Sequence, residues 1–192
     1  MSRPTEPAVV IVPGLRDHVA EHWQTLLADA LTTAGRDVHT VPPLTQDRLS
    51  CTAQVEALHQ VIARIDGPVV LVAHSAGVIT AVHWAHRYGG DVTGALLATP
   101  PDFDSPLPEG YPAPEELADN GWTPVPRKPL PFPTLVAASA NDPLGGFARI
   151  AELARDWESR LVELGAVGHL NPASGHGPWP RALELLAELP QD

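Results

Sequence analysis

The hydrophobic pattern of the chain alternates between short apolar runs and longer stretches whose apolar residues recur every three or four positions. The runs cover residues 8–12, 38–41, 69–73, 92–98, 134–138 and 160–164. Most of them hold few polar residues, which is typical of strands that are buried on both faces of a parallel sheet. The pattern therefore predicts six short strands.

Five of the stretches around these strands carry helical periodicity. The predicted helices cover about 19–34, 52–65, 76–88, 147–158 and 180–189, with a brief helix possible around 114–118. Gly35 ends the first helix, Ser50 or Thr52 caps the second, and Pro180 takes the N1 position of the last. Because strands alternate with helices, we expect a single α/β domain over residues 1–192. It is a three-layer αβα sandwich around a doubly wound parallel sheet with right-handed crossovers.

The segment 100–133 departs from this alternation. It holds 11 of the 22 prolines of the chain, which leave room for only a brief helix. Four aromatic residues are spread through it, namely Phe103, Tyr111, Trp122 and Phe132. We expect a semi-rigid loop that lies over the carboxyl ends of the strands and covers the site. A solvent-facing linker between two halves of the sheet is the alternative.

Charge and hydropathy narrow the range of functions. The formal net charge is −11, and no cluster of Lys and Arg forms a face for phosphates. This balance argues against binding to nucleic acid or to an anionic membrane surface. The first apolar run, residues 8–12, is too short for a signal sequence or a membrane span. We therefore expect a soluble, cytoplasmic protein.

No cofactor or metal site is predicted. Cys51 is the single cysteine, which excludes an internal disulfide and a cysteine metal cluster. We interpret it as a small structural or exposed residue rather than as a nucleophile. His83 and His86 are three residues apart on a predicted helix, but no third ligand has a supporting spacing. A glycine-rich phosphate fingerprint is also absent from the sequence.

The strongest chemical signal is Ser75, in the stretch Ala73-His74-Ser75-Ala76-Gly77. This small-x-Ser-x-Gly pattern joins a predicted buried strand to a predicted helix, the context of a nucleophile elbow. Small residues at Ala73 and Gly77 let the strand and helix backbones approach closely. The amides that begin the helix then point at the position where an oxyanion would form.

A serine nucleophile needs a base, and the base needs a group that holds its tautomer. Asp142 follows the strand 134–138, and His169 follows the strand 160–164, so that the order is Ser, acid, His. Asp102 and Asp104 are the rival acids. His176 is the rival base, less favoured because His169 lies nearer to the end of its strand.

The oxyanion hole needs two backbone amides. The amide of Ala76, the residue after the nucleophile, is the first, and we expect the second from Leu15 in the loop after the first strand. Gly14 permits the close turn of that loop.

Substrate contacts are expected from residues of the same loop, from the elbow and from the proline-rich segment. These candidates are Gly14, Arg16, His18, His74 and Trp122. Arg16 either reaches an acidic group of the substrate or pairs with Asp17. A structural role is the alternative for His74, because its side chain should point away from the nucleophile.

In these residues the chain resembles the small serine hydrolases of the α/β-hydrolase superfamily, a group that includes YdeN-like and retinoblastoma-binding-protein-nine-like hydrolases. The matching stretches are Val12-Pro13-Gly14-Leu15, Glu21-His22-Trp23-Gln24, Ala73-His74-Ser75-Ala76-Gly77, Ser139-Ala140-Asn141-Asp142-Pro143 and Gly168-His169-Leu170-Asn171. The resemblance implies a compact α/β-hydrolase fold with strand order 2-1-3-4-5-6. It also implies Ser75, Asp142 and His169 as the catalytic triad.

The chain departs from this group in two places. Ala73 stands where glycine is usual, and Arg16-Asp17-His18 stands where some relatives are glycine-rich. The pocket-protein ligand motif Leu-x-Cys-x-Glu is also missing, since Ala53 takes the place of its acid. We therefore carry over no protein partner.

These patterns predict a serine hydrolase that cleaves small carboxylic esters through an acyl-enzyme. An acyltransferase or cyclising enzyme with the same triad is one alternative, in which a substrate hydroxyl or amine replaces water. A protein-binding module on a hydrolase fold is the other. The oligomeric state is left open.

Overall fold

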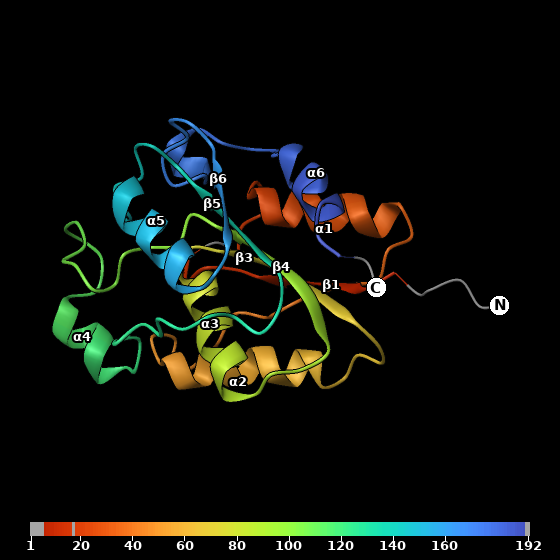
Figure 1. Ribbon diagram of the computed structural model, residues 1–192, viewed down its shortest axis with the longest axis horizontal. Coiled ribbons are helices and arrows are strands. Elements are labelled where there is room, and N and C mark those ends of the chain that lie inside the picture. Colours follow the sequence, from red (N-terminus) through yellow and green to blue (C-terminus); the bar gives the residue numbers. More distant parts are fainter. Residues whose placement is uncertain (1–5, 17, 191–192) are drawn as a thin grey trace.

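Six parallel strands form one twisted sheet in the order β2-β1-β3-β4-β5-β6 (Figure 1). The computed structural model describes residues 6–16 and 18–190. The strands are β1 (Ala8–Val12), β2 (Val38–Thr40), β3 (Val69–His74), β4 (Val92–Ala98), β5 (Thr134–Ala138) and β6 (Arg160–Glu163). Both the six predicted strands and the order implied by the resemblance are confirmed.

Helices cover both faces of the sheet. On one face lie α1 (Trp23–Thr33) and α6 (Arg181–Ala187), and on the other α2 (Cys51–Ile62) and α3 (Ala76–Arg87) (Figure 1). The buried side chains of α5 (Phe147–Asp156) join the core on the α2–α3 face. A short helix, α4 (Pro114–Asp119), lies within the proline-rich segment, and a 3-10 turn covers Pro172–Ser174. The three-layer sandwich is confirmed.

Two of the helices begin at other residues than the sequence pattern predicts. The first helix begins at Trp23 rather than near residue 19, because Nδ1 of His22 accepts from the amide of Gln24 at 3.2 Å and caps it. Ser50 caps α2 by accepting from the amide of Ala53 at 3.2 Å. Pro180 stands at the cap position of α6 rather than at N1.

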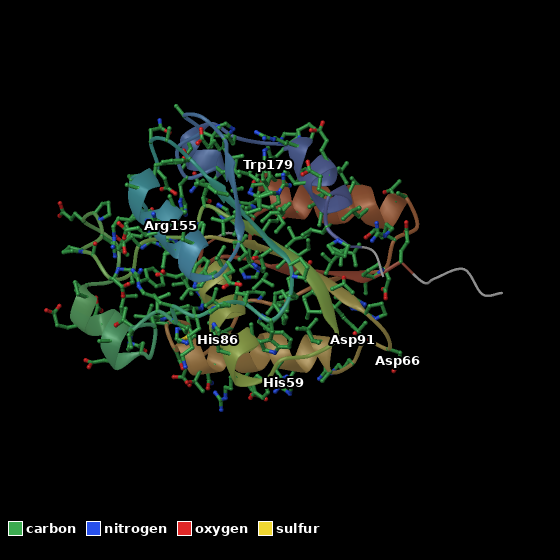
Figure 2. The ribbon with its side chains drawn as sticks, in the orientation of Figure 1. His59, Asp66, His86, Asp91, Arg155 and Trp179 are labelled. Atoms are coloured by element: carbon green, nitrogen blue, oxygen red, sulfur yellow. The ribbon has the colours of Figure 1, made fainter. Side chains whose placement is uncertain are left out.

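The strands divide the core between the two faces of the sheet. Because successive side chains of a strand point to opposite faces, Val10 and Leu71 join the core under α2 and α3, whereas Val9 and Val70 join the core under α1 and α6. On the second side, the ring of Trp179 (labelled in Figure 2) meets that of Trp23 edge-on, with the ring centres 4.8 Å apart. Both faces of the central strands are therefore buried.

The proline-rich segment is packed against the body of the molecule. Trp122 is fully buried, donates from Nε1 to the carbonyl of Leu49 at 2.6 Å, and meets the ring of Phe103 edge-on. Farther along, the Trp157 indole donates to the carbonyl of Pro126 at 2.8 Å. These contacts tie the segment to the residues that precede α2 and follow α5.

Within residues 6–16 and 18–190, no helix is both long enough and apolar enough to cross a membrane.

Candidate active site

Ser75 occupies a strained turn between β3 and α3. Its backbone has φ 55° and ψ −130°, a region that residues other than glycine seldom adopt. Gly77 shows why the turn needs a small residue, since a Cβ atom there would lie 2.2 Å from the carbonyl oxygen of Val12. The turn therefore presents the Ser75 hydroxyl at the carboxyl edge of the sheet, as an elbow does.

The structure brings Ser75, His169 and Asp142 together. Nε2 of His169 lies 2.8 Å from Oγ of Ser75, and Nδ1 lies 2.8 Å and 3.0 Å from the two carboxylate oxygens of Asp142. Both His169 and Asp142 are buried. Because a carboxylate only accepts hydrogen bonds, the ring carries its proton on Nδ1, and Nε2 is left to accept from the serine hydroxyl.

Backbone and side-chain bonds hold the acid and the base in place. One oxygen of Asp142 accepts from the amide of Leu144 at 2.9 Å. The amide of His169 donates to Oγ of Ser174 at 2.9 Å. Gly168 has φ 58°, and a Cβ there would lie 2.7 Å from the same Ser174 oxygen. The loop therefore requires glycine immediately before the histidine.

Two polar side chains before Asp142 connect the acid loop to the histidine loop. Oδ1 of Asn141 accepts from the amide of Gly168 at 2.7 Å, and Oγ of Ser139 accepts from the amide of Val167 at 3.2 Å. Sequence reasoning assigned no role to either residue. Their polar side chains directly after a buried strand were the available signal.

The structure corrects the expected substrate contacts of His74 and Trp122. His74 is fully buried, and its Nε2 lies 2.9 Å from the carbonyl oxygen of His169. A carbonyl only accepts, so this nitrogen of His74 donates. Trp122 is also fully buried and is not among the residues that line the pocket. Both side chains are therefore part of the packing around the site rather than of its surface. For His74 this is the structural role that the sequence offered as the alternative.

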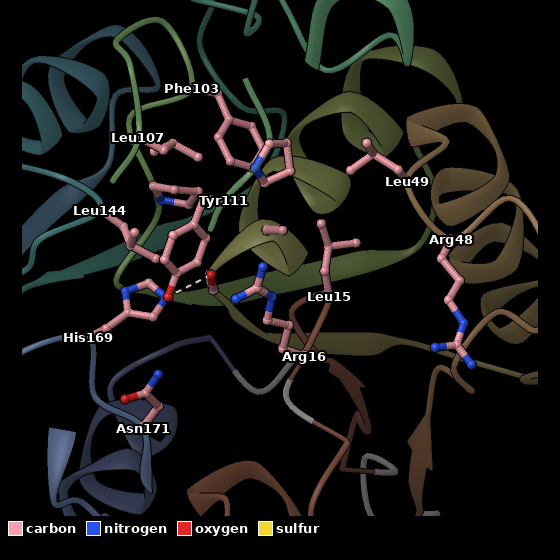
Figure 3. Close-up of a pocket in the computed structure, with 14 residues that line it drawn as sticks. Leu15, Arg16, Arg48, Leu49, Phe103, Leu107, Tyr111, Leu144, His169 and Asn171 are labelled. Carbon is pink, nitrogen blue, oxygen red and sulfur yellow. Dashed lines mark hydrogen bonds between the residues drawn. The ribbon is translucent and has the colours of Figure 1, made fainter. Parts of the chain in front are cut away.

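A pocket of about 230 Å³ opens beside Ser75 (Figure 3). Its lining is mainly apolar and comes from the loop after β1, the loop before α2, the turn between β3 and α3, the proline-rich segment and the loops after β5 and β6. The lining residues are Leu15, Arg16, Arg48, Leu49, Ser75, Ala76, Pro101, Phe103, Leu107, Tyr111, Pro112, Leu144, His169 and Asn171. Phe103 and Tyr111 are two of the four aromatic residues that the sequence shows in the proline-rich segment, and these aromatic residues were the sequence signal that the segment covers the site.

The predicted oxyanion residues also line this pocket. Ala76 is the first residue of α3, so its amide belongs to the first turn, where amides have no acceptor within the helix. Leu15 lines the same pocket from the loop after β1.

The other residues of the β1 loop have a different placement. Gly14 and His18 line a neighbouring hollow that shares Leu15, Arg16 and Arg48 with the pocket, rather than the pocket itself. Asp17, the alternative partner of Arg16, lies outside the described residues.

The rival acids and base are engaged elsewhere. Asp102 pairs with Arg149 at 3.2 Å, and Asp104 pairs with Arg127 at 3.1 Å. His176 does not line the pocket, and its amide donates to the carbonyl of Asn171.

Two other groups that sequence reasoning weighed lie away from Ser75. Nε2 of His83 bonds to the carbonyl of Trp122 at 3.1 Å, and His86 lies in the α2–α3 layer (Figure 2). In the described part of the chain, no three potential metal ligands gather. Cys51 is buried at the start of α2, and burial raises the pKa of its thiol from 9.0 to about 12.

Comparisons with known proteins found a matching family model and similar solved structures. The family model described as "Serine hydrolase" matches residues 9–188. A structure described as a YdeN-like hydrolase, from Pectobacterium atrosepticum, is 29% identical, with a TM-score of 0.78, covering 95% of this chain and 90% of that one. The ydeN gene product of Bacillus subtilis is 19% identical, with a TM-score of 0.73 and coverages of 95% and 97%. No curated protein matches the chain.

Proposed function

The chain belongs to the serine hydrolase family, and from this premise we propose that it cleaves small carboxylic esters through an acyl-enzyme on Ser75. The observation that carries the proposal is the continuous chain of short contacts from Ser75 through His169 to Asp142. A serine activated in this way attacks carbonyl carbon.

In each half of the proposed reaction, His169 takes up one proton and then gives it away. Oγ of Ser75 attacks the ester carbonyl while Nε2 of His169 takes the hydroxyl proton. The imidazolium then returns that proton to the departing alcohol, and the acyl group stays on Ser75. In the second half, water gives one proton to Nε2 and attacks the acyl carbon. The imidazolium then returns that proton to Oγ of Ser75 as the acyl–oxygen bond breaks, and the acid leaves. Asp142 keeps the ring oriented and stabilises the imidazolium throughout.

The oxyanion of each tetrahedral intermediate needs donors that are already in place. We assign this role to the amides of Ala76 and Leu15, because both residues line the pocket beside Ser75. The start of α3 adds the positive end of its dipole to the Ala76 amide.

The pocket supports a short acyl group. Its volume of about 230 Å³ is small for a ligand site. Side chains such as Phe103, Leu107 and Leu144 make one wall apolar, which suits a few methylene groups.

A fluorophosphonate probe followed by intact-mass analysis tests the proposal. We expect one adduct on the wild type, none on Ser75→Ala, and a strong loss of labelling rate in His169→Ala. His176→Ala is the matched control, since it removes a histidine of the same loop that lies outside the pocket. Ester turnover should fall by about 10³-fold or more in Ser75→Ala.

If the folded wild type forms no adduct, the proposal that Ser75 is an activated nucleophile is overturned. Equal slowing by His169→Ala and His176→Ala would remove the assignment of the base.

A further inference from the structure

We propose that the ester cleaved at Ser75 carries a carboxylate, which Arg16 binds. The inference rests on the proposed function and deepens it, since it names the chemical class of the substrate. Three features carry it: the position of the Arg16 guanidinium, the charge of the pocket lining, and the size of the pocket.

The guanidinium of Arg16 contacts two residues of the proline-rich segment. Its Nη2 donates to the carbonyl of Gly110 at 2.6 Å, and its carbon lies 4.5 Å from the centre of the Tyr111 ring. Figure 3 shows Arg16 between Leu15 and Tyr111, with its charged end toward the middle of the pocket. Two contacts to residues 94 or more positions away therefore orient a cation near the serine.

The charge of the lining is unusual for this protein. The whole chain has 23 acidic residues against 12 Lys and Arg, yet none of the 14 described lining residues is Asp or Glu. The lining instead contains two cations, Arg16 and Arg48. Arg48 lies at the edge of the pocket in Figure 3, so Arg16 is the cation placed to meet a ligand.

Arginine chemistry favours a carboxylate as its partner. The planar guanidinium carries five N–H donors in a fork that matches the two oxygens of a carboxylate. One of these donors contacts Gly110, and the guanidinium carbon lies over the Tyr111 ring. The orientation is thus set before the ligand binds, which lowers the entropy lost on binding.

The size of the pocket limits the spacer between carboxylate and ester. A volume of about 230 Å³ holds a short chain, and its apolar wall of Phe103, Leu107 and Leu144 suits methylene groups. The substrate class is therefore a half-ester of a short dicarboxylic acid. Its hydrolysis consumes one water and releases an alcohol, a dicarboxylate and one proton.

A matched pair of esters tests the inference. Monoethyl succinate carries the carboxylate, and ethyl 4-methylpentanoate replaces it with an isopropyl group of the same shape. We expect wild-type kcat/KM to be at least about tenfold higher for the succinate ester, measured by ethanol release. Arg16→Met should lower this value about 10- to 100-fold while changing the neutral ester less than about threefold.

Two further variants separate local binding from general charge. Arg16→Lys keeps a cation and should retain part of the preference, which added salt should reduce. Arg64→Met is the control, because it removes the same charge from an exposed site. Arg64 precedes β3 and so lies toward the amino ends of the strands, opposite to Ser75. This variant should leave kcat/KM for both esters unchanged.

The outcomes distinguish the two proposals. Equal loss on both esters in Arg16→Met, or a wild type without preference for the succinate ester, overturns the carboxylate inference. If Ser75 still takes the fluorophosphonate in those samples, the proposed hydrolase function stands without it. If wild-type Ser75 takes no probe, both proposals are overturned.

Discussion

At the residue scale, His74 has a role that its position in the elbow did not reveal. Its Nε2 donates to the carbonyl of His169 at 2.9 Å, and the two rings lie with their centres 5.0 Å apart. Oγ1 of Thr99 donates to the same carbonyl at 3.4 Å. The backbone of the proposed base is thus fixed by side chains at the ends of β3 and β4, and His74 is a positioning residue.

Replacing His74 should therefore impair turnover more than binding. We expect His74→Ala to lower kcat about tenfold with little change in KM, because one positioning hydrogen bond is lost. His74→Gln should restore part of kcat, since its amide can donate from a similar place. Steady-state kinetics on one ester measures both, and a rise in KM alone would contradict the assignment.

The buried thiol of Cys51 should be inert. Burial disfavours the thiolate and raises the pKa to about 12, so the thiol stays neutral at pH 8. We expect almost no alkylation by iodoacetamide in the native protein and complete alkylation in denaturant, followed by mass spectrometry. Rapid stoichiometric labelling of the folded protein would contradict this burial.

The same raised pKa has a consequence for stability. Because the folded pKa lies above the ordinary value of 9.0, the contribution of the neutral thiol is present below pH 9 and is lost as the pH rises toward 12. A Cys51→Ala variant should show less of this alkaline loss in urea unfolding than the wild type. Identical alkaline profiles would contradict the linkage.

At the element scale, the turn between β3 and α3 depends on the close approach of α3 to the end of β1. A methyl group at Gly77 would lie 2.2 Å from one carbonyl oxygen and 2.7 Å from the next, both of them rigid backbone. The same approach sets the start of the helix whose first amide we assign to the oxyanion hole.

Gly77→Ala should therefore destabilise the fold by about 3 kcal/mol or more, since the backbone must move to admit the methyl group. Gly146→Ala is the control: no atom lies within 4 Å of its added Cβ, and its φ is −57°. We expect that change to stay within about 1 kcal/mol. Urea unfolding compares the two, and similar midpoints would contradict the argument.

At the scale of the whole molecule, the proline-rich segment has two faces. Trp122, Leu117 and Val125 are buried in the core, whereas Leu107, Tyr111 and Pro112 line the pocket. Arg127 adds ion pairs to Asp104 and Asp156, at 3.1 Å and 2.7 Å. One face anchors the segment, and the other shapes the pocket.

The anchoring face should dominate stability. Trp122→Ala removes a fully buried ring and should cost about 3–5 kcal/mol, together with faster proteolysis within 100–133. Tyr111→Ala, at a partly exposed pocket residue, should cost less than about 1 kcal/mol. Urea unfolding and limited proteolysis measure both effects. Equal stabilities would show that Trp122 does not anchor the segment.

The sequence alone determined the strands, their parallel arrangement and the residues of the elbow. Apolar runs report burial on both faces of a sheet, and parallel strands place their carboxyl ends at one edge. That logic predicted that Ser75, Asp142 and His169 meet at this edge, and in the structure His169 lies 2.8 Å from both Ser75 and Asp142. These signals are local, so they can be recognised without knowing what packs against them.

Only the tertiary structure decided the rest of the site. The bond from Arg16 to Gly110 spans 94 positions, and that from His74 to His169 spans 95. No periodicity or motif encodes such pairs, because they depend on how whole loops fold back over the sheet. For the same reason His74 and Trp122, expected in the pocket, lie buried behind it. Local pattern set the chemistry at the sheet edge, and long-range packing set the shape and charge of the pocket above it.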